Sequence, residues 1–197
     1  MEAADVCEKA SDDLVDMMPP HTPIWDIQWT TCEPRCADFG GIYNFFNDPE
    51  NRRQLNAAGD FTWEMGSGPV GGALRPDRVK SQIHNVESLL ENGVKVLVYN
   101  GANDYICNWV GGKAWTQAVE WTHKDSFGKK AFEEWTGTEG EVGGLIQNYE
   151  NFTFLIFNGA GHMVQERQPA NGIKMMHDFM EYGASLTPKS EEKFLKE

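Results

Sequence analysis

The sequence predicts an α/β fold, in which helices flank a parallel β-sheet. Two apolar runs, at residues 94–99 and 151–157, have the composition of buried strands, and each ends in an Asn-Gly-Ala turn. Before the first run, apolar residues recur at helical spacing, and Gly93 alone stands between that predicted helix and the run. A helix that leads so directly into a buried strand is typical of α/β units, so we expect both strands in one sheet.

The N-terminal part of the chain predicts short helices joined by irregular segments. Residues 1–18 indicate an acidic helix that a Pro-Pro pair ends, with an apolar face of Val6, Ala10, Leu14 and Met17 or Met18. Residues 19–47 hold prolines and aromatic residues without a sustained period, which indicates an irregular segment. Asp48 and Pro49 then predict the N-cap and the first residue of a short helix that Gly59 ends.

The middle of the chain predicts one helix on each side of the first strand. A Gly-rich loop or hairpin is expected at residues 59–72, and Asp77 is expected to cap a helix that Gly93 ends. The apolar stripe of this helix consists of Val79, Ile83, Val86 and Leu90. After the strand, Asn108 precedes a helix expected at residues 109–121.

The last third of the chain alternates helices with the second strand. Residues 127–135 predict a half-exposed helix, and the Gly-rich residues 136–148 form either a hairpin or a mobile loop. After the second strand, a helix is expected at residues 169–182, with one apolar face of Ile173, Met176 and Met180. We therefore predict a helical and irregular segment at residues 1–47, a main α/β part at 48–185 and a polar tail at 186–197.

The charge balance excludes two classes of partner. Seventeen Lys and Arg against thirty Asp and Glu give a formal net charge of -13, which repels nucleic-acid phosphates and anionic lipids. No apolar run approaches the roughly 20 residues of a membrane helix, and the acidic N-terminus lacks the basic and apolar regions of a signal peptide. We expect neither nucleic acid nor a membrane as a partner.

The cysteines and the glycine motifs indicate no metal and no cofactor. Four cysteines are too few for a disulfide scaffold, and no Cys or His pair has the spacing of a zinc site. Cys32 and Cys36 either close a short disulfide loop or remain reduced thiols. Asn151 begins the tripeptide Asn-Phe-Thr, an acceptor for N-glycosylation in the secretory pathway. The run GAGHMV fails as a dinucleotide loop, because Val164 stands where the third glycine is needed.

Asp104 and His162 form the candidate site. Each follows one of the two Asn-Gly-Ala turns, and side chains beyond the carboxyl ends of parallel strands meet at one edge of a sheet. There the Asp104 carboxylate can hold the His162 imidazole in one tautomer and stabilise its protonated form, as in a nucleophilic triad. The alternatives are a turn-capping role for Asp104 and a hydrogen-bonding role alone for His162.

Two motifs carry a family resemblance. The stretches VLVYNGANDYICNW and FTFLIFNGAGHMV, and more loosely WDI at Trp25, resemble segments of the serine carboxypeptidases. The resemblance implies the C-terminal portion of an α/β-hydrolase that removes C-terminal residues from peptides in lysosomes, vacuoles or secretions. It implies that Asp104 is the triad acid and His162 the general base, and that Cys107 and Met163 contact the peptide substrate.

The sequence departs from this family at two places. Gln165 stands where a proline is usual, which alters the loop beside the histidine. The spacing of Cys32 and Cys36 is shorter than the loop that the family leads us to expect, which leaves their disulfide open.

The nucleophile of the triad is absent from the sequence. The family places its serine in a Gly-x-Ser-x-Gly motif ahead of the acid, and none of the seven serines stands in such a motif. Ser67 alone has a neighbouring glycine, with Met65 and Pro69 at the outer positions. We therefore expect the chain to be inactive by itself.

Three interpretations account for the absent serine. The chain is a fragment of a serine carboxypeptidase, one chain of an enzyme whose serine lies on a partner, or a non-catalytic module that binds peptides. The first two predict an incomplete sheet with an exposed edge, and therefore poor solubility or association with another half.

Overall fold

A computed structural model describes residues 3–20, 22–28, 40–57 and 61–186 of the 197-residue chain. The chain forms two compact units: Met1–Met17 with Thr31–Lys80, and Met18–Thr30 with Ser81–Glu197. Cys32 and Cys36 lie outside the described residues, so their pairing stays a prediction. The segment boundaries predicted after residues 47 and 185 stay predictions as well.

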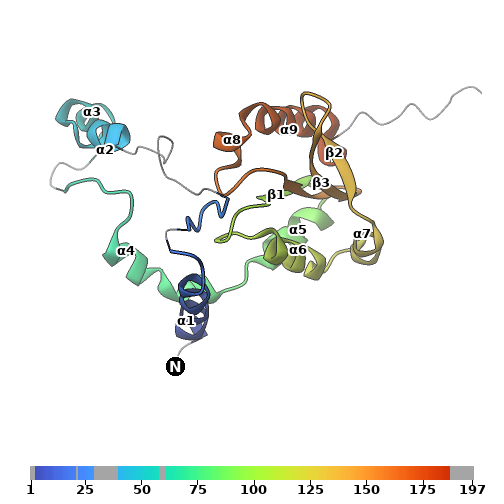
Figure 1. Cartoon of the computed structure of the whole chain (residues 1–197), viewed down its shortest axis with the longest axis horizontal. Helices are drawn as coiled ribbons and strands as arrows, with labels where there is room; N and C mark the ends of the chain where they lie inside the picture. The colour runs from blue at the N-terminus through green and yellow to red at the C-terminus, as the bar shows by residue number, and fades with distance from the viewer. Residues whose placement is uncertain (1–2, 21, 29–39, 58–60, 187–197) are drawn as a thin grey trace, which may run out of the picture. The chain divides into compact units, whose positions relative to one another are not determined.

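The second unit is built on a four-stranded sheet in the order β1-β4-β3-β2 (Figure 1). The two predicted strands are β1 (Val96–Gly101) and β4 (Phe152–Phe157), which pair in parallel as neighbours. The prediction of a buried strand is confirmed for β4 and wrong for β1, which is partly buried except at Gly101 and exposes Tyr99, because β1 has a strand neighbour on one side alone among the described residues. On the other side of β4, β3 (Val142–Tyr149) pairs antiparallel, and β2 (Glu133–Thr136) pairs antiparallel with β3. The sheet is therefore mixed rather than parallel, because the Gly-rich segment forms a hairpin that adds two antiparallel strands.

Helices cover both faces of this sheet (Figure 1). On one face Phe152, Phe154 and Ile156 of β4 pack with residues of α5 (Ile83–Glu91), α6 (Trp109–Ala118) and α7 (Lys124–Lys129). On the other face Leu155 and Phe157 pack with residues of α8 (Val164–Arg167) and α9 (Pro169–Tyr182). All six residues of β4 are buried, because alternate side chains enter opposite layers of the core.

Helix α6 begins as predicted and ends earlier. The Asn108 side chain accepts a hydrogen bond from the Gly111 amide at 2.8 Å and so caps the first turn. The helix stops at Ala118 instead of Trp121, because the backbone of Val119 leaves the helical conformation and both Val119 and Trp121 enter the core.

The helix before β1 is shorter than predicted. Asp77 belongs to the 3-10 helix η1 (Arg75–Val79), and the extended backbone of Lys80 separates η1 from α5. The prediction that Asp77 caps α5 is therefore wrong. The prediction that Ile83, Val86 and Leu90 form one apolar face is confirmed, since Leu90 is buried and Ile83 and Val86 pack against the same core cluster.

The helix predicted at residues 127–135 is wrong. Phe127, in α7, stacks on Phe152 with ring centroids 4.7 Å apart, whereas Trp135, in β2, contacts Phe157 at 5.2 Å. Phe152 and Phe157 lie on opposite faces of the sheet. One straight helix cannot reach both faces, so the chain leaves α7 and continues as a strand.

Helix α9 has the predicted bounds but the opposite face inward. The predicted apolar face is exposed: Ile173 (72%), Met176 (45%) and Met180 (73%). The buried residues are Asn171, Gly172, Met175 and Asp178. Leu186, which follows α9 and the 3-10 turn η2 (Gly183–Ser185), is fully buried in the core beneath α9.

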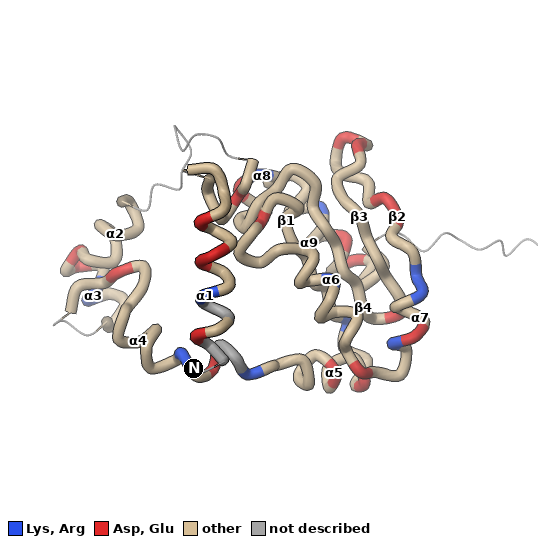
Figure 2. The backbone as a smooth tube through the Cα atoms, turned by 60° about the horizontal axis from the view of Figure 1, so that its bottom comes forward, with Lys and Arg blue, Asp and Glu red and all other residues tan. Residues whose placement is uncertain are grey.

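The described residues of the first unit form five helices, which are α1 (Ala3–Asp16), α2 (Gly40–Asn47), α3 (Pro49–Gln54), α4 (Gly68–Ala73) and η1. Asp48 caps α3 as predicted, with its side chain accepting from the amides of Glu50 and Asn51, but α3 ends at Gln54, before the predicted end at Gly59. The prediction of an irregular segment at residues 19–47 is wrong for its last eight residues, which form α2. A short helix, α4, lies where a loop or hairpin was expected, because Ser67 provides its N-cap. Figure 2 shows the acidic residues of α1, whose predicted apolar face is half exposed at Val6 and Leu14. Among the described residues, no helix has the length and apolar character needed to cross a membrane.

Candidate active site

Two turns meet at one edge of the sheet. Because β1 and β4 are parallel neighbours, the turns that follow Gly101 and Phe157 both leave the carboxyl edge. The turns are joined by backbone hydrogen bonds, from the Ala102 amide to the Phe157 carbonyl at 2.8 Å and from the Asn103 amide to the Ala160 carbonyl at 2.9 Å. The strands therefore hold Asp104 and His162 on a common rigid base.

The candidate acid and base are in direct contact. Nδ1 of His162 lies 2.9 Å from Oδ2 of Asp104. The Asp104 side chain is 3% exposed and that of His162 is 33% exposed, so the carboxylate is enclosed while the imidazole reaches the surface. The second carboxylate oxygen accepts a hydrogen bond from the Cys107 amide at 3.1 Å. Because both carboxylate oxygens accept hydrogen bonds, the carboxylate is held in one orientation. Nδ1 of His162 donates to it, so Nε2 is the ring nitrogen that can accept a proton in a reaction.

A segment from the start of the second unit crosses both turns. We call residues 24–27 the strap. The Trp25 carbonyl accepts from the His162 amide at 2.7 Å, and the Ile27 amide donates to the Asn103 carbonyl at 2.9 Å. The Trp25 ring also lies against His162, with ring centroids 4.9 Å apart and planes at 55°. The strap therefore positions the backbone and the ring of His162.

Two positions, Gly101 and Gly161, have no room for a side chain, because the backbones of the turns and the strap lie very close together there. A Cβ at Gly101 would lie 2.2 Å from the Gly161 carbonyl oxygen. A Cβ at Gly161 would lie 2.3 Å from the Trp25 carbonyl oxygen and 2.6 Å from the Asp26 Cβ. These glycines are required by the packing of backbone on backbone.

An ion pair between a buried carboxylate and a partly exposed guanidinium anchors the strap. Asp26 is 2% exposed, and its Oδ2 lies 3.2 Å from Nε of Arg167 in α8. The other carboxylate oxygen accepts from the Gln28 amide at 3.1 Å. The sequence motif WDI marked this segment only loosely, and no role was predicted for Asp26 or Arg167.

Cys107 and Met163 stand beside the Asp104–His162 pair. Both residues are exposed. Although Cys107 is exposed as a residue, partial burial of its thiol and the negative charge of Asp104 raise the pKa of Cys107 above its ordinary value. One donor atom from each of Asp104, Cys107 and His162 lies within 4.8 Å of the others. The structure thus brings Cys107 next to the predicted acid and base, while its contact with a peptide substrate stays a prediction.

The comparison with known families decides the relationship. A model of the serine carboxypeptidase family matches residues 5–182 of the chain. The chain belongs to the serine carboxypeptidase family.

Named relatives agree with this assignment. Serine carboxypeptidase-like 49 of Arabidopsis thaliana is 36% identical over 80% of this chain and 30% of its own length. Serine carboxypeptidase-like 48 of the same plant is 34% identical over 93% of this chain and 35% of its own length. Carboxypeptidase Y of Komagataella phaffii is 41% identical over 51% of this chain and 19% of its own length. The chain spans about a third of the length of the two plant relatives.

A solved structure shows the same fold. The prohormone-processing carboxypeptidase Kex1(Δ)p of Saccharomyces cerevisiae superposes with a TM-score of 0.61 and 24% identity. The similarity covers 77% of this chain and 35% of that one. The second unit therefore has the architecture of part of an α/β-hydrolase, with a mixed sheet between two helical layers.

The departure of this chain from the serine carboxypeptidase pattern at Gln165 has a local structural consequence. The Gln165 amide nitrogen donates a hydrogen bond to the Tyr99 hydroxyl at 2.9 Å. This bond joins α8 to β1 directly beside the turn that carries His162.

Ser67, the serine next to glycine, caps α4 in the first unit through a 3.4 Å hydrogen bond from the Val70 amide.

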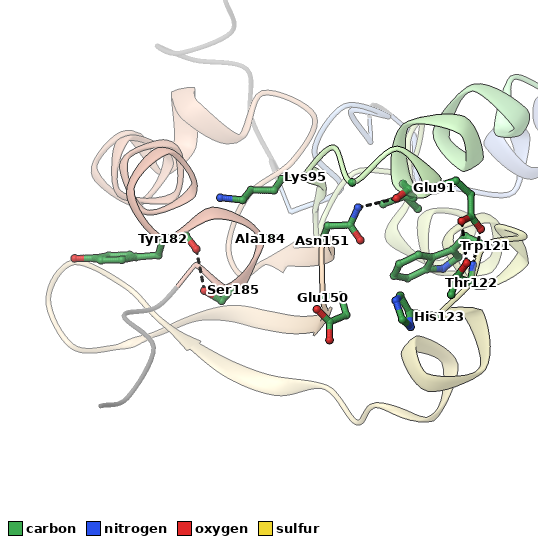
Figure 3. A pocket seen from close by; sticks show the side chains of 12 residues that line it. Glu91, Lys95, Trp121, Thr122, His123, Glu150, Asn151, Tyr182, Ala184 and Ser185 are labelled. Carbon is green, nitrogen blue, oxygen red and sulfur yellow. Dashed lines mark hydrogen bonds between the residues drawn. The ribbon is translucent and has the colours of Figure 1, made fainter. Parts of the chain in front are cut away.

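A pocket of about 540 Å³ lies at the other edge of the sheet (Figure 3). Among its lining residues, Lys95 precedes β1 and Asn151 precedes β4, so the pocket is at the amino ends of the parallel strands. Catalytic side chains of α/β folds lie at the carboxyl edge, so this pocket is not the candidate active site of a serine carboxypeptidase.

Asn151, the predicted glycan acceptor, is part of this pocket. Its amide nitrogen donates to the backbone carbonyls of Leu90 at 3.0 Å and Val94 at 2.9 Å. Thr153, the third residue of the tripeptide, is fully buried in β4. Glycosylation at Asn151 stays a prediction, and this geometry opposes it, because a glycan has to displace bonds that hold the α5–β1 connection.

Proposed function

We propose that this chain provides the acid–base pair of a serine-type carboxypeptidase and that the nucleophilic serine comes from outside it. The observation that carries the proposal is the 2.9 Å contact between His162 Nδ1 and Asp104 Oδ2 at the carboxyl edge of parallel strands. Family membership supports hydrolysis of C-terminal peptide bonds as the reaction. The absence of a Gly-x-Ser-x-Gly motif from the sequence supports inactivity of the chain alone.

In the proposed reaction a serine hydroxyl attacks the carbonyl carbon of the last peptide bond while Nε2 of His162 accepts the hydroxyl proton. Nε2 then gives that proton to the leaving amino group, and water cleaves the acyl-serine ester by the same two transfers. Asp104 keeps the Nδ1 proton facing its carboxylate and stabilises the imidazolium. Cys107 and Met163 are proposed to contact the peptide, since both are exposed beside His162.

The test compares hydrolysis of an N-blocked dipeptide by the purified chain, by His162→Ala and by His177→Ala. His177 is the matched control, because its side chain is 66% exposed on α9. All three proteins should release product no faster than a blank, while NMR of histidine protons shows that the hydrogen bond to Asp104 is formed in the wild type. Turnover that survives in His177→Ala and is lost in His162→Ala would show that the chain contains its own nucleophile.

A non-catalytic peptide-binding role is the second candidate. It is favoured by two exposed apolar side chains at His162, Trp25 at 51% and Met163 at 55%. Two results together would favour this role. A peptide would change the tryptophan fluorescence equally in the wild type and in His162→Ala, and the chain would not hydrolyse that peptide when mixed with a protein that carries the serine half. A lysosomal, vacuolar or secreted location is part of the first proposal, and family membership supports it.

A further inference from the structure

Three different metal-binding groups converge at the carboxyl edge of the sheet. The Asp104 carboxylate, the Cys107 thiol and the His162 imidazole each offer a ligand atom within 4.8 Å of the other two. Cys107 is held beside the carboxylate by its own amide, which donates to Asp104 Oδ1 at 3.1 Å. Among the described residues, no other group of three His, Cys, Asp or Glu side chains has its ligand atoms this close together.

The spacing of these atoms is close to what a zinc ion requires. Zinc binds thiolate, imidazole and carboxylate at about 2.0–2.3 Å in a tetrahedron, which separates the ligand atoms by about 3.3–3.8 Å. In the structure Nδ1 of His162 lies 2.9 Å from Oδ2 of Asp104, and one ligand atom from each of the three residues lies within 4.8 Å of the others. Shifts of about 1 Å or less in the side chains of Cys107 and His162, both of which reach the surface, therefore complete the site around the enclosed Asp104 carboxylate.

We propose that Asp104, Cys107 and His162 bind one zinc ion, with water as the fourth ligand. The carboxylate and the thiolate neutralise the two positive charges, and the net charge of -13 raises the local concentration of cations. An entry path exists, because Cys107 and the His162 ring reach the surface. Sequence spacing does not reveal the site, since His162 is 58 residues away from Asp104.

Zinc at this site excludes the acid–base function. Nδ1 cannot direct a lone pair at a metal and donate a proton to Asp104 at the same time, so zinc coordinated by Nδ1 replaces the 2.9 Å hydrogen bond. Zinc is thus an inhibitor of the proposed reaction. Zinc binding itself does not rest on the proposed function, and its test uses no activity measurement.

The test titrates the metal-free, full chain with Co²⁺, whose thiolate complexes absorb through charge transfer, and then displaces Co²⁺ with Zn²⁺. A variant with Cys7, Cys32 and Cys36 replaced by serine keeps Cys107 as the only thiol. We expect one equivalent of metal to bind this variant with the charge-transfer band, and zinc to abolish the His162–Asp104 proton resonance. Cys107→Ser should remove the band, and His162→Gln and Asp104→Asn should each weaken zinc binding at least about tenfold.

His177→Gln is the matched control, because His177 lies beside Asp178 and Glu181 on α9 and lacks a neighbouring thiol among the described residues. Its zinc affinity should equal that of the parent. The proposal is overturned if the single-thiol variant shows no charge-transfer band, or if zinc affinity is unchanged in Cys107→Ser and His162→Gln.

Discussion

Replacing Gly101 by alanine tests whether the two turns of the candidate site are in direct contact. The added Cβ would lie 2.2 Å from the Gly161 carbonyl oxygen and 2.4 Å from that of Ala160. Cβ contacts below 3.0 Å are essentially never seen, so the second turn has to retreat by about 0.8 Å. Transmitted in full, that shift lengthens the 2.9 Å distance between His162 Nδ1 and Asp104 Oδ2 to about 3.7 Å, too long for a hydrogen bond.

We expect Gly101→Ala to lower the free energy of unfolding by about 1–3 kcal/mol, the usual cost of overpacking a close-packed site. Urea denaturation followed by tryptophan fluorescence measures this loss, and the NMR resonance of the His162 Nδ1 proton reports the hydrogen bond. Gly111→Ala is the matched control, because Gly111 is exposed in α6 and its Cβ would meet no atom closer than 3.4 Å. Alanine there should leave stability unchanged or raise it by up to about 1 kcal/mol. A Gly101→Ala protein with wild-type stability and an unchanged His162 resonance would refute the reasoning.

The remaining predictions concern the side chains of Cys107 and Asn151. Since burial and the charge of Asp104 raise the pKa of the Cys107 thiol, iodoacetamide should alkylate Cys107 more slowly than a free cysteine at neutral pH in the presence of EDTA. Asp104→Asn removes the negative charge and should move the pH profile of the Cys107 alkylation rate to lower pH. An unchanged profile would contradict the contribution of the Asp104 charge to the raised pKa. Asn151→Ala removes two hydrogen bonds to backbone carbonyls and should cost about 1–3 kcal/mol in urea denaturation, more than Asn92→Ala, which loses one exposed bond. Because those bonds occupy the amide, peptide mass spectrometry after secretory expression should find Asn151 without a glycan.

The contact between Asp104 and His162 could be predicted from the sequence for a simple physical reason. Buried parallel strands need continuous apolar runs, and such runs are visible without a structure. Once two of them are neighbours, their carboxyl ends share an edge, so the residues just beyond the turns must lie close together. The resemblance to serine carboxypeptidases added the roles of the two side chains, but their proximity follows from the strands.

The strap could not be predicted, because it acts through its backbone. The contacts from Trp25 and Ile27 to the two turns use main-chain groups, which every residue possesses, so no side-chain pattern records them. The ion pair between Asp26 and Arg167 joins residues far apart in the sequence and follows no local spacing. Such contacts become visible only when the fold brings the segments together.

The error on α9 has a different cause, which is the burial of a polar side chain with specific partners. Asn171 is buried because its side chain accepts from the Thr138 amide at 2.8 Å and donates to Glu141 at 2.8 Å. Hydrophobic periodicity counts such a residue as exposed and therefore turns the helix to the wrong face. Trp135 was assigned to a helix by its neighbours, whereas its contact with Phe157 requires a strand.

The acid–base pair is held by contacts that do not involve a nucleophile. Asp104 is fixed by the Cys107 amide and by the turn after β1, and His162 is fixed by the Trp25 carbonyl and by the turn after β4. All of these groups belong to the second unit of the chain. The pair should therefore form whether or not a serine is present, because the energy that orders it comes from backbone hydrogen bonds and glycine packing. A preformed pair with an accessible thiol beside it has two uses, as the acid–base half of a hydrolase and as a metal site, and these uses exclude each other because both require Nδ1 of His162.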